Sequence, residues 1–264
     1  MAGVTDPLDL VAALGRGVLG LCRGVGTLTL FALAGLSHIL RPPFYGRLFA
    51  RALTDIGYFS LPVVALTAIF TGMVLALQSS TGLARFSAET AMPTLVVLSI
   101  TRELGPVLAG LMVAGRVGAA MAAEIGTMRV TDQIDALTTL STNPMKYLVA
   151  PRLLAGIVAL PLLVVVADIL GVFGGFIVAT LKLGFNPHTY LSNTLTYMET
   201  QDVVSGLTKA AVFGFLISLM GCYHGYNSRG GAQGVGSATT MAVVSASVLI
   251  LAFDYLLSEL FFVR

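Results

Sequence analysis

The chain has 264 residues, of which 56% are hydrophobic and only 11% are charged, and its formal net charge is +2. A soluble domain usually carries about 25% charged residues, so this composition excludes an ordinary water-exposed surface. The small net charge gives no reason to expect a nucleic-acid partner. We therefore expect a single integral membrane domain built from helices, because helices satisfy their own backbone hydrogen bonds in lipid.

Residues 1–50 are interpreted as a region containing an N-terminal interfacial helix. Asp9, Arg16 and Arg23 recur every seven residues and therefore share one helical face, whereas the opposite face is apolar. Such an amphipathic pattern is typical of a helix that lies in the membrane interface. Residues 24–40 contain no Lys, Arg, Asp or Glu, which leaves a sixth membrane span as the alternative.

Five long apolar stretches within residues 51–264 predict five membrane spans. They cover residues 57–77, 91–115, 153–181, 203–222 and 242–263. Each reaches roughly the 20 residues that an α-helix needs to cross the bilayer core. Ten Lys and Arg residues fall on one side of this arrangement and three on the other, so the positive-inside rule places the N-terminus in the cytoplasm.

Small residues recur at every fourth position in three of the expected helices. One such series is Ala68, Gly72 and Ala76, and another is Gly171, Gly175 and Ala179. Series of this kind let helix backbones approach closely in lipid. They predict a compact bundle but do not point to any one function.

Two charges and a proline interrupt the second expected span. Arg102 and Glu103 lie inside it, and Pro106 has no N–H to bond the carbonyl of Arg102, four residues earlier. A free carbonyl and two charges are tolerated in hydrocarbon only against protein or a wet cavity. This pattern favours a transport site, and the alternative interpretation is a buried ion pair with Lys209 or Asp254.

Lys209, Asp254 and Asp168 also lie inside expected spans. Each is costly there and needs a partner or water. We expect Lys209 in the outer half of its helix, where one interpretation is that its long side chain reaches the interface.

Residues 116–152 are expected to form a long cytoplasmic loop with a short amphipathic helix near 124–140. Val130, Ile134 and Leu137 share one helical face, and the Asn-Pro pair at 143–144 ends the helix. The other faces carry Arg129, Asp132, Gln133 and Asp135. Such a helix suits docking onto a soluble partner, and lying on the membrane is the alternative.

No nucleotide-binding loop of the form G-x-x-x-x-G-K-[ST] occurs in the sequence, and the Gly-rich residues 225–240 are expected to be a flexible turn. We therefore expect no catalytic residues, no metal site and no cofactor in this chain. Two rival classes stay open. One is a secondary transporter that uses Arg102, Glu103 and Asp254 as a proton relay. The other is an intramembrane enzyme that uses His224 and a nearby serine, although no G-x-S-x-G supports it.

Several short sequences together carry a resemblance to a known family. They are residues 71–78 (TGMVLALQ), 102–107 (RELGPV), 114–118 (AGRVG), 123–134 (AEIGTMRVTDQI), 143–144 (NP), 150–152 (APR) and 238–240 (ATT). On these sequences the chain resembles the MlaE/YrbE-type permeases of ABC transporters that work with MCE proteins. The resemblance covers nearly the whole chain and is weakest over the first 50 residues.

The resemblance implies an N-terminal interfacial helix, five spans and a permease homodimer in the bacterial inner membrane. It also implies three partners: an MlaF-like ABC ATPase that binds ATP and Mg²⁺, an MlaB-like STAS-domain subunit, and a hexamer of MlaD-like MCE protein. The expected substrate is phospholipid, moved between the inner membrane and the MCE protein to maintain outer-membrane lipid asymmetry. The alternative is a secondary transporter of a hydrophobic or sterol-like substrate without an ATPase partner.

The resemblance further assigns residues to two sites. The residues expected around the lipid cavity are Leu75, Phe86, Arg102, Glu103, Leu104 and Lys209. The residues expected to couple the permease to its ATPase are Glu124, Arg129, Asp132, Gln133 and Asp135. Phe86 stands where a relative has Tyr, which keeps the ring but removes a hydroxyl that would bond a headgroup.

Overall fold

The computed structural model describes residues 7–39, 41–85 and 89–262, and this part of the chain contains helices and turns but no strand. The α-helices are α1 (Pro7–Ile39), α2 (Gly46–Ile56), α3 (Leu61–Ala84), α4 (Met92–Ser99), α5 (Gly105–Val113), α6 (Ala119–Val130), α7 (Gln133–Thr139), α8 (Ala150–Leu181), α9 (Pro187–Tyr197), α10 (Thr200–Tyr226) and α11 (Gly231–Phe262). The 3₁₀ turns are η1 (Tyr58–Ser60) and η2 (Glu89–Ala91), and the π-helical turns are η3 (Ile100–Leu104), η4 (Ala114–Gly118) and η5 (Met145–Val149).

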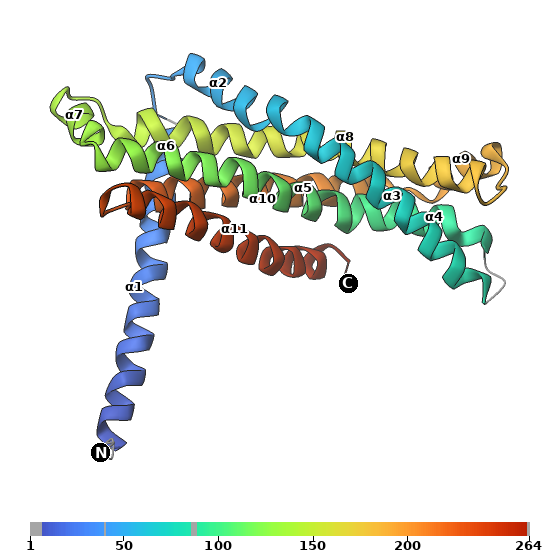
Figure 1. Cartoon of the computed structure of the whole chain (residues 1–264), viewed down its shortest axis with the longest axis horizontal. Coiled ribbons are helices and arrows are strands. Elements are labelled where there is room, and N and C mark those ends of the chain that lie inside the picture. Colours follow the sequence, from blue (N-terminus) through green and yellow to red (C-terminus); the bar gives the residue numbers. More distant parts are fainter. Residues whose placement is uncertain (1–6, 40, 86–88, 263–264) are drawn as a thin grey trace.

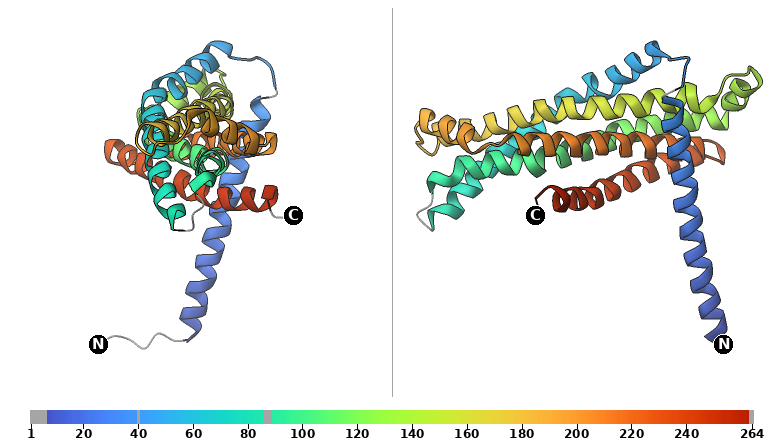
Figure 2. Two further views of the ribbon diagram at one scale, coloured as in Figure 1. Left: turned by 90° about the vertical axis from the view of Figure 1, so that its right-hand side faces the viewer. Right: turned by 180° about the vertical axis from the view of Figure 1, so that it is seen from behind.

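The long helices run side by side along one axis and form an elongated bundle (Figure 1). Helix α7 lies at one end of the bundle, together with the beginnings of α2 and α11, and we call this the α7 end. Helix α9, the end of α3 and the beginning of α4 lie at the opposite end, as Figure 1 and the right-hand view of Figure 2 show. The arginines of α2 and of the segment around α7 therefore gather at one end, as the predicted distribution of loop charges requires.

Within the part of the chain that the structure describes, six helical segments are long and apolar enough to cross a membrane. They are Gly15–Ile39, Gly46–Ala84, Met92–Val130, Met145–Leu181, Thr200–Tyr226 and Gly231–Phe262. The outer surface of the bundle carries large apolar side chains such as Phe70, Leu162 and Ile169, each more than half exposed. Exposed apolar surface on this scale is unfavourable in water and suits a lipid environment. The chain is an all-α integral membrane protein.

The structure has one such segment more than the five predicted spans, and the additional segment is Gly15–Ile39 in helix α1. It leaves the α7 end of the bundle steeply across the bundle axis, and its N-terminal part extends away from the other helices (Figures 1 and 2). Val18, Leu19 and Leu30 are exposed along it. If the bundle axis follows the membrane normal, this direction places α1 along the membrane surface. An interfacial α1 therefore stays the prediction.

Glycines permit close approach of helix backbones, both within the predicted small-residue series, as at Gly72, and outside it, as at Gly174 and Gly156. A Cβ added at Gly72 on α3 would collide with the carbonyl of Gly171 on α8, and one at Gly174 would collide with the carbonyl of Ile69. The same holds between α8 and α10, where Gly156 faces Gly214. The prediction that these series permit tight packing is confirmed.

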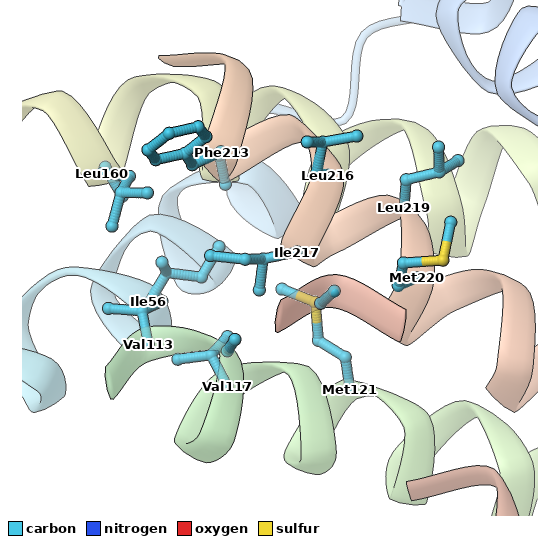
Figure 3. Packing of buried hydrophobic residues seen from close by; sticks show 14 of the residues in the cluster. Ile56, Val113, Val117, Met121, Leu160, Phe213, Leu216, Ile217, Leu219 and Met220 are labelled. Atoms are coloured by element: carbon cyan, nitrogen blue, oxygen red, sulfur yellow. The ribbon is translucent and has the colours of Figure 1, made fainter. Parts of the chain in front are cut away.

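The main apolar core fills the space between α10, α8, α5 and the segment from η4 to α6 (Figure 3). Phe213 and Ile217 of α10 are fully buried at its centre, and they meet Leu160 of α8 and Val113 and Val117 from the second span. A second cluster around Met92, Val96 and Tyr190 closes the α9 end. These cores hold α10 in the middle of the bundle, so any charge on its inner face is surrounded by protein.

Two segments are more helical than expected. The second span does not end near residue 115 but continues through α6 to Val130, which shortens the predicted 116–152 loop to the stretch around α7. The expected flexible turn at 225–240 is confined to a few residues between α10 and α11, and Gly231 opens a helix of 32 residues. In both places the helix buries side chains against α10 and thereby offsets the low helix propensity of glycine.

Candidate functional site

Lys209 on α10 is the centre of a charged cluster inside the bundle. Its side chain is 0% exposed, and its ammonium donates to the Arg102 carbonyl at 2.9 Å, to Glu103 Oε2 at 2.8 Å and to Ser258 Oγ at 2.7 Å. Asp254 Oδ1 of α11 lies 2.9 Å from the same nitrogen. The three hydrogen bonds use all three ammonium protons, so Asp254 adds an electrostatic contact.

The cluster holds more carboxylate than ammonium. Glu103 and Asp254 share the single charge of Lys209. The Ser258 hydroxyl lies 3.0 Å from Glu103 Oε1 and 2.8 Å from the backbone carbonyl of Asp254, and its one proton can be donated to either oxygen. Glu103 remains 42% exposed although Lys209 is completely buried. The negative charge that Lys209 does not balance is therefore accessible from outside the cluster at the Glu103 side chain.

Arg102 forms a second ion pair beside the first. Its Nη2 and Nε lie 2.6 and 2.7 Å from Asp202 Oδ1 at the start of α10, and its guanidinium stands 4.5 Å from the centre of the Phe262 ring. Asp202 is 1% exposed and its other oxygen accepts from the Glu199 N–H, completing a capping box. Arg102 itself is 33% exposed, so part of its guanidinium faces out of the bundle.

The local backbone explains how these charges come together. Because Pro106 offers no N–H, the chain passes through the π-helical turn η3 before α5 begins, and the Gly105 N–H bonds the Ile100 carbonyl. The Arg102 carbonyl that Pro106 leaves free accepts a hydrogen bond from the Lys209 ammonium. Sequence reasoning predicted the free carbonyl, and it left an ion pair with Lys209 or Asp254 as the alternative interpretation of Arg102 and Glu103. The structure pairs Glu103 with Lys209, but it pairs Arg102 with Asp202.

The expected lipid-cavity residues do not all share one place. Arg102, Glu103 and Lys209 meet in the cluster, whereas Leu104 lines a separate cavity of about 20 Å³ between α3, α5 and α8, room for about one water. Leu75 packs against the core cluster at the α9 end. Phe86 lies outside the described residues.

One interpretation of Lys209 is wrong, and two partners were missed. Lys209 does not reach the interface, because its ammonium is fully buried among protein acceptors. Asp202 was not expected, although its spacing to Glu199 is the signature of a helix start. Ser258 was not expected either, and its position four residues after Asp254 on α11 is the only signal that could have found it.

The expected ATPase-coupling residues lie on two elements. The predicted single helix is broken at Asp132, which has φ 58° and caps α7, so Val130 ends α6 and Ile134 and Leu137 belong to α7. Aspartate tolerates this left-handed conformation better than most residues do. Arg129 pairs with the exposed Asp135 at 2.7 Å. Glu124 lies farther back on α6 and pairs with Arg152 at 2.8 Å.

His224 and Ser245 do meet, but not as a base and its nucleophile. His224 Nε2 lies 3.0 Å from Ser245 Oγ, and the Ser245 hydroxyl is 2.6 Å from the Met241 carbonyl, which accepts its proton. The imidazole must then donate to the serine, and an N–H that donates cannot take the hydroxyl proton. This pair gives no support to an intramembrane enzyme.

The described residues form an all-helical membrane bundle with charges buried at its centre, and intramembrane charges of this kind mark transport pathways in membrane proteins. Residues 49–260 match the family model described as Permease MlaE, and the chain belongs to the MlaE permease family. It is 57% identical over 255 residues to a probable ABC transporter permease protein of Rickettsia bellii, covering 97% of this chain and 98% of the relative.

Two more distant relatives agree with this assignment. A probable ABC transporter permease protein of Synechocystis is 40% identical over 225 residues, covering 85% of this chain and 86% of the relative. The intermembrane phospholipid transport system permease protein MlaE of Haemophilus influenzae is 34% identical over 261 residues, covering 97% and 98%. The chain is thus a multi-pass permease of the ABC transporter class.

Proposed function

We propose that this permease moves phospholipid between the bacterial inner membrane and a periplasmic MCE protein, and so maintains outer-membrane lipid asymmetry. The observation that carries the proposal is the half-exposed pair Arg102 and Glu103, held in place by the fully buried Lys209 and Asp202. The name of the Haemophilus relative, which specifies intermembrane phospholipid transport, supports the same substrate.

The chemistry of the cluster suits a zwitterionic headgroup. Arg102 keeps part of its guanidinium exposed, and a guanidinium can bond phosphate through two parallel N–H groups. Glu103 presents the carboxylate charge that Lys209 does not fully balance, and an amine on the headgroup would complement it. The lipid tails would lie against apolar groups, for which Leu75, Leu104 and Phe86 remain the predicted candidates.

A homodimer would complete the lipid site. The small cavity beside Leu104 is far too small for a phospholipid, so we infer that the lipid binds where two permease copies face each other. In this assembly α1 lies in the interface of the inner membrane and the N-terminus is cytoplasmic. The exposed apolar residues of α1 support this placement.

ATP hydrolysis would occur in a separate MlaF-like ATPase that binds ATP and Mg²⁺, accompanied by an MlaB-like STAS-domain subunit. Helix α7 is the element we assign to ATPase docking, because it protrudes at one end of the bundle (Figure 1). Ile134 anchors it in the core at 1% exposure, while Arg129, Asp132, Gln133 and Asp135 surround it. An MlaD-like MCE hexamer would receive lipid at the α9 end.

The test compares Arg102→Gln and Glu103→Gln in the complete transporter with Glu259→Gln, which removes an exposed carboxylate one residue from Ser258. Assembly, basal ATPase rate and lipid transfer between proteoliposomes are measured for each. We expect normal assembly with transfer reduced at least tenfold in the two cluster variants and unchanged in the control. Normal transfer by both cluster variants would exclude this lipid site, and transfer without any ATPase would favour a secondary transporter.

A further inference from the structure

A cleft of about 480 Å³ opens beside α2 at the α7 end of the bundle. Its walls come from α2, from η4 and α6, and from η5 and the start of α8. Three arginines line it, Arg51, Arg116 and Arg152, together with the carboxylates of Asp55 and Glu124. We call it the arginine cleft. None of the expected lipid-binding residues lines it.

The arginines of this cleft retain free donors. Arg152 is engaged by Glu124 at 2.8 Å. Arg116 donates through Nη1 to the Asp55 carbonyl at 3.1 Å and to Ser60 Oγ at 2.9 Å, which leaves Nε and Nη2 of its five-donor guanidinium for another acceptor. Arg51 is exposed and makes no ion pair within the described part of the chain. Because three arginines face two carboxylates, the cleft has a net charge of +1.

The remainder of the cleft is apolar. Ile56, Val117, Met121 and Leu148 contribute buried side chains to its walls. Just beyond α2, Tyr58 and Phe59 are exposed, and the Phe59 ring lies 5.9 Å from the Arg116 guanidinium. Exposed aromatic residues next to arginines are typical of the level of the lipid headgroups.

We propose that the arginine cleft binds one anionic phospholipid of the adjacent leaflet as a resident ligand that is not transported. A single phosphodiester matches the net charge of the cleft, and the apolar walls accept the glycerol and upper acyl chains. Basic pockets between membrane helices are known to hold acidic lipid headgroups. A soluble anion would not use the apolar walls, so the occupant is an amphiphile.

The arginine cleft is separate from the Lys209 cluster. Arg116 follows Arg102 by 14 residues on one continuous helical segment, which corresponds to about 20 Å along the helix axis. A lipid held at Arg116 therefore lies at a different depth in the membrane from a headgroup held at Arg102. The two sites can be occupied independently and tested independently.

The experiment uses the purified, delipidated full chain and native mass spectrometry. Phosphatidylglycerol and phosphatidylcholine with identical acyl chains compete at equal concentration. We expect the wild type to retain one phosphatidylglycerol with about tenfold preference. Arg51→Gln should lower this preference about fivefold, the effect of losing one basic residue near a membrane surface. Circular dichroism checks that the variant remains folded.

Two control variants make the result decisive. Arg47→Gln removes an exposed charge from the same helix but outside the cleft. Lys182→Gln removes an exposed charge directly after α8, so both variants should keep the wild-type preference. Glycerol phosphate should not displace the lipid, nor should binding of the ATPase. Equal retention of both lipids, an equal loss in Arg47→Gln, a loss in Lys182→Gln, or displacement by either competitor would overturn the proposal.

Discussion

One continuous helical segment contributes Arg102 and Glu103 to the Lys209 cluster and Arg116 and Glu124 to the arginine cleft. The two regions satisfy their charges differently. In the cluster, the ammonium is fully buried and each of its protons has an acceptor. In the cleft, Arg51 and Arg116 remain exposed and Arg116 uses only part of its donors. A charge that is removed from both water and lipid headgroups needs partners within the protein. A charge at the interface can instead be paired by water or by lipid headgroups.

This difference predicts how much each charge contributes to stability. Interactions between charges are strong where water is excluded and weak where solvent screens them. Deleting a member of the buried cluster leaves its partners uncompensated, while deleting a member of the cleft lets water replace it. Substitutions at the two regions should therefore differ by several kcal/mol.

The largest effect is expected for Lys209→Met. The substitution leaves Glu103 and Asp254 without their cation and frees the Arg102 carbonyl, which should cost about 3–5 kcal/mol and most of the folded protein. Because the chain has no Trp, thermal unfolding is followed by circular dichroism in detergent. Adding Glu103→Gln and Asp254→Asn to Lys209→Met should recover part of the loss. Wild-type stability of the single variant would contradict the assigned role of Lys209.

A smaller effect is expected where helix packing supports the cluster. Gly72 of α3 packs against the backbone of Gly171 on α8, which in turn lies against Ile100 at the start of η3. Gly72→Ala should therefore cost about 1–3 kcal/mol through overpacking. Gly82→Ala is the matched control on the same helix, because a Cβ there meets nothing within 4 Å. Equal thermal stability of the two variants would show that the close approach is not required.

Charge reversal on α7 tests a third charged region, which faces neither core nor cleft. Asp135→Arg should weaken ATPase binding about tenfold, because rim charges govern association, and should leave the permease folded. The exchange Arg129→Asp with Asp135→Arg restores the ion pair seen at 2.7 Å but not the surface charge pattern. Co-purification of the ATPase should remain low in the exchange variant. If the exchange variant recovered full ATPase binding, the ion pair between residues 129 and 135 alone would be responsible for the effect.

The smallest effect is expected for Glu124→Gln at the arginine cleft. Glu124 is largely exposed in its pair with Arg152, so removing its charge should change stability by about 0.2–1 kcal/mol. The same unfolding measurement on Glu103→Gln should give a larger loss. If the two variants lose the same stability, then burial does not distinguish the two regions.

The sequence was sufficient to predict the features that follow from local chemistry. Pro106 predicts the free carbonyl of Arg102, the small residues around Gly72 predict tight packing, and uncharged stretches predict helices long enough to span. All three depend on rules that apply within one helix. The pairing of Arg102 and Glu103 with Lys209 or Asp254 was open among alternatives, because it depends on which helices are neighbours.

The remaining features depend on contacts that no local rule specifies. Asp202 meets Arg102 only because α10 packs against η3, a pairing of residues 100 positions apart. The break at Asp132 follows from a left-handed residue that tertiary packing selects. The burial of Lys209 follows from the position of Ser258 and Asp254 on α11, which closes over it. One interpretation placed that lysine at the interface, whereas the alternative, a buried ion pair, gave it the partner Glu103 that the structure shows.

The π-helical turns η3 and η4 have a consequence for how the protein tolerates insertions and deletions. Each π turn holds a residue beyond the α-helical repeat, and successive residues of a helix point about 100° apart. Deleting one residue within Ile100–Leu104 would restore the regular repeat and rotate everything that follows, including Arg116 and α7, relative to Glu103. The number of residues between Glu103 and α7 therefore sets how the proposed lipid site and the proposed ATPase-docking end are oriented relative to each other. A deletion or insertion of one residue there would change the orientation of one end of the permease relative to the other, while the side chains at each end stay the same.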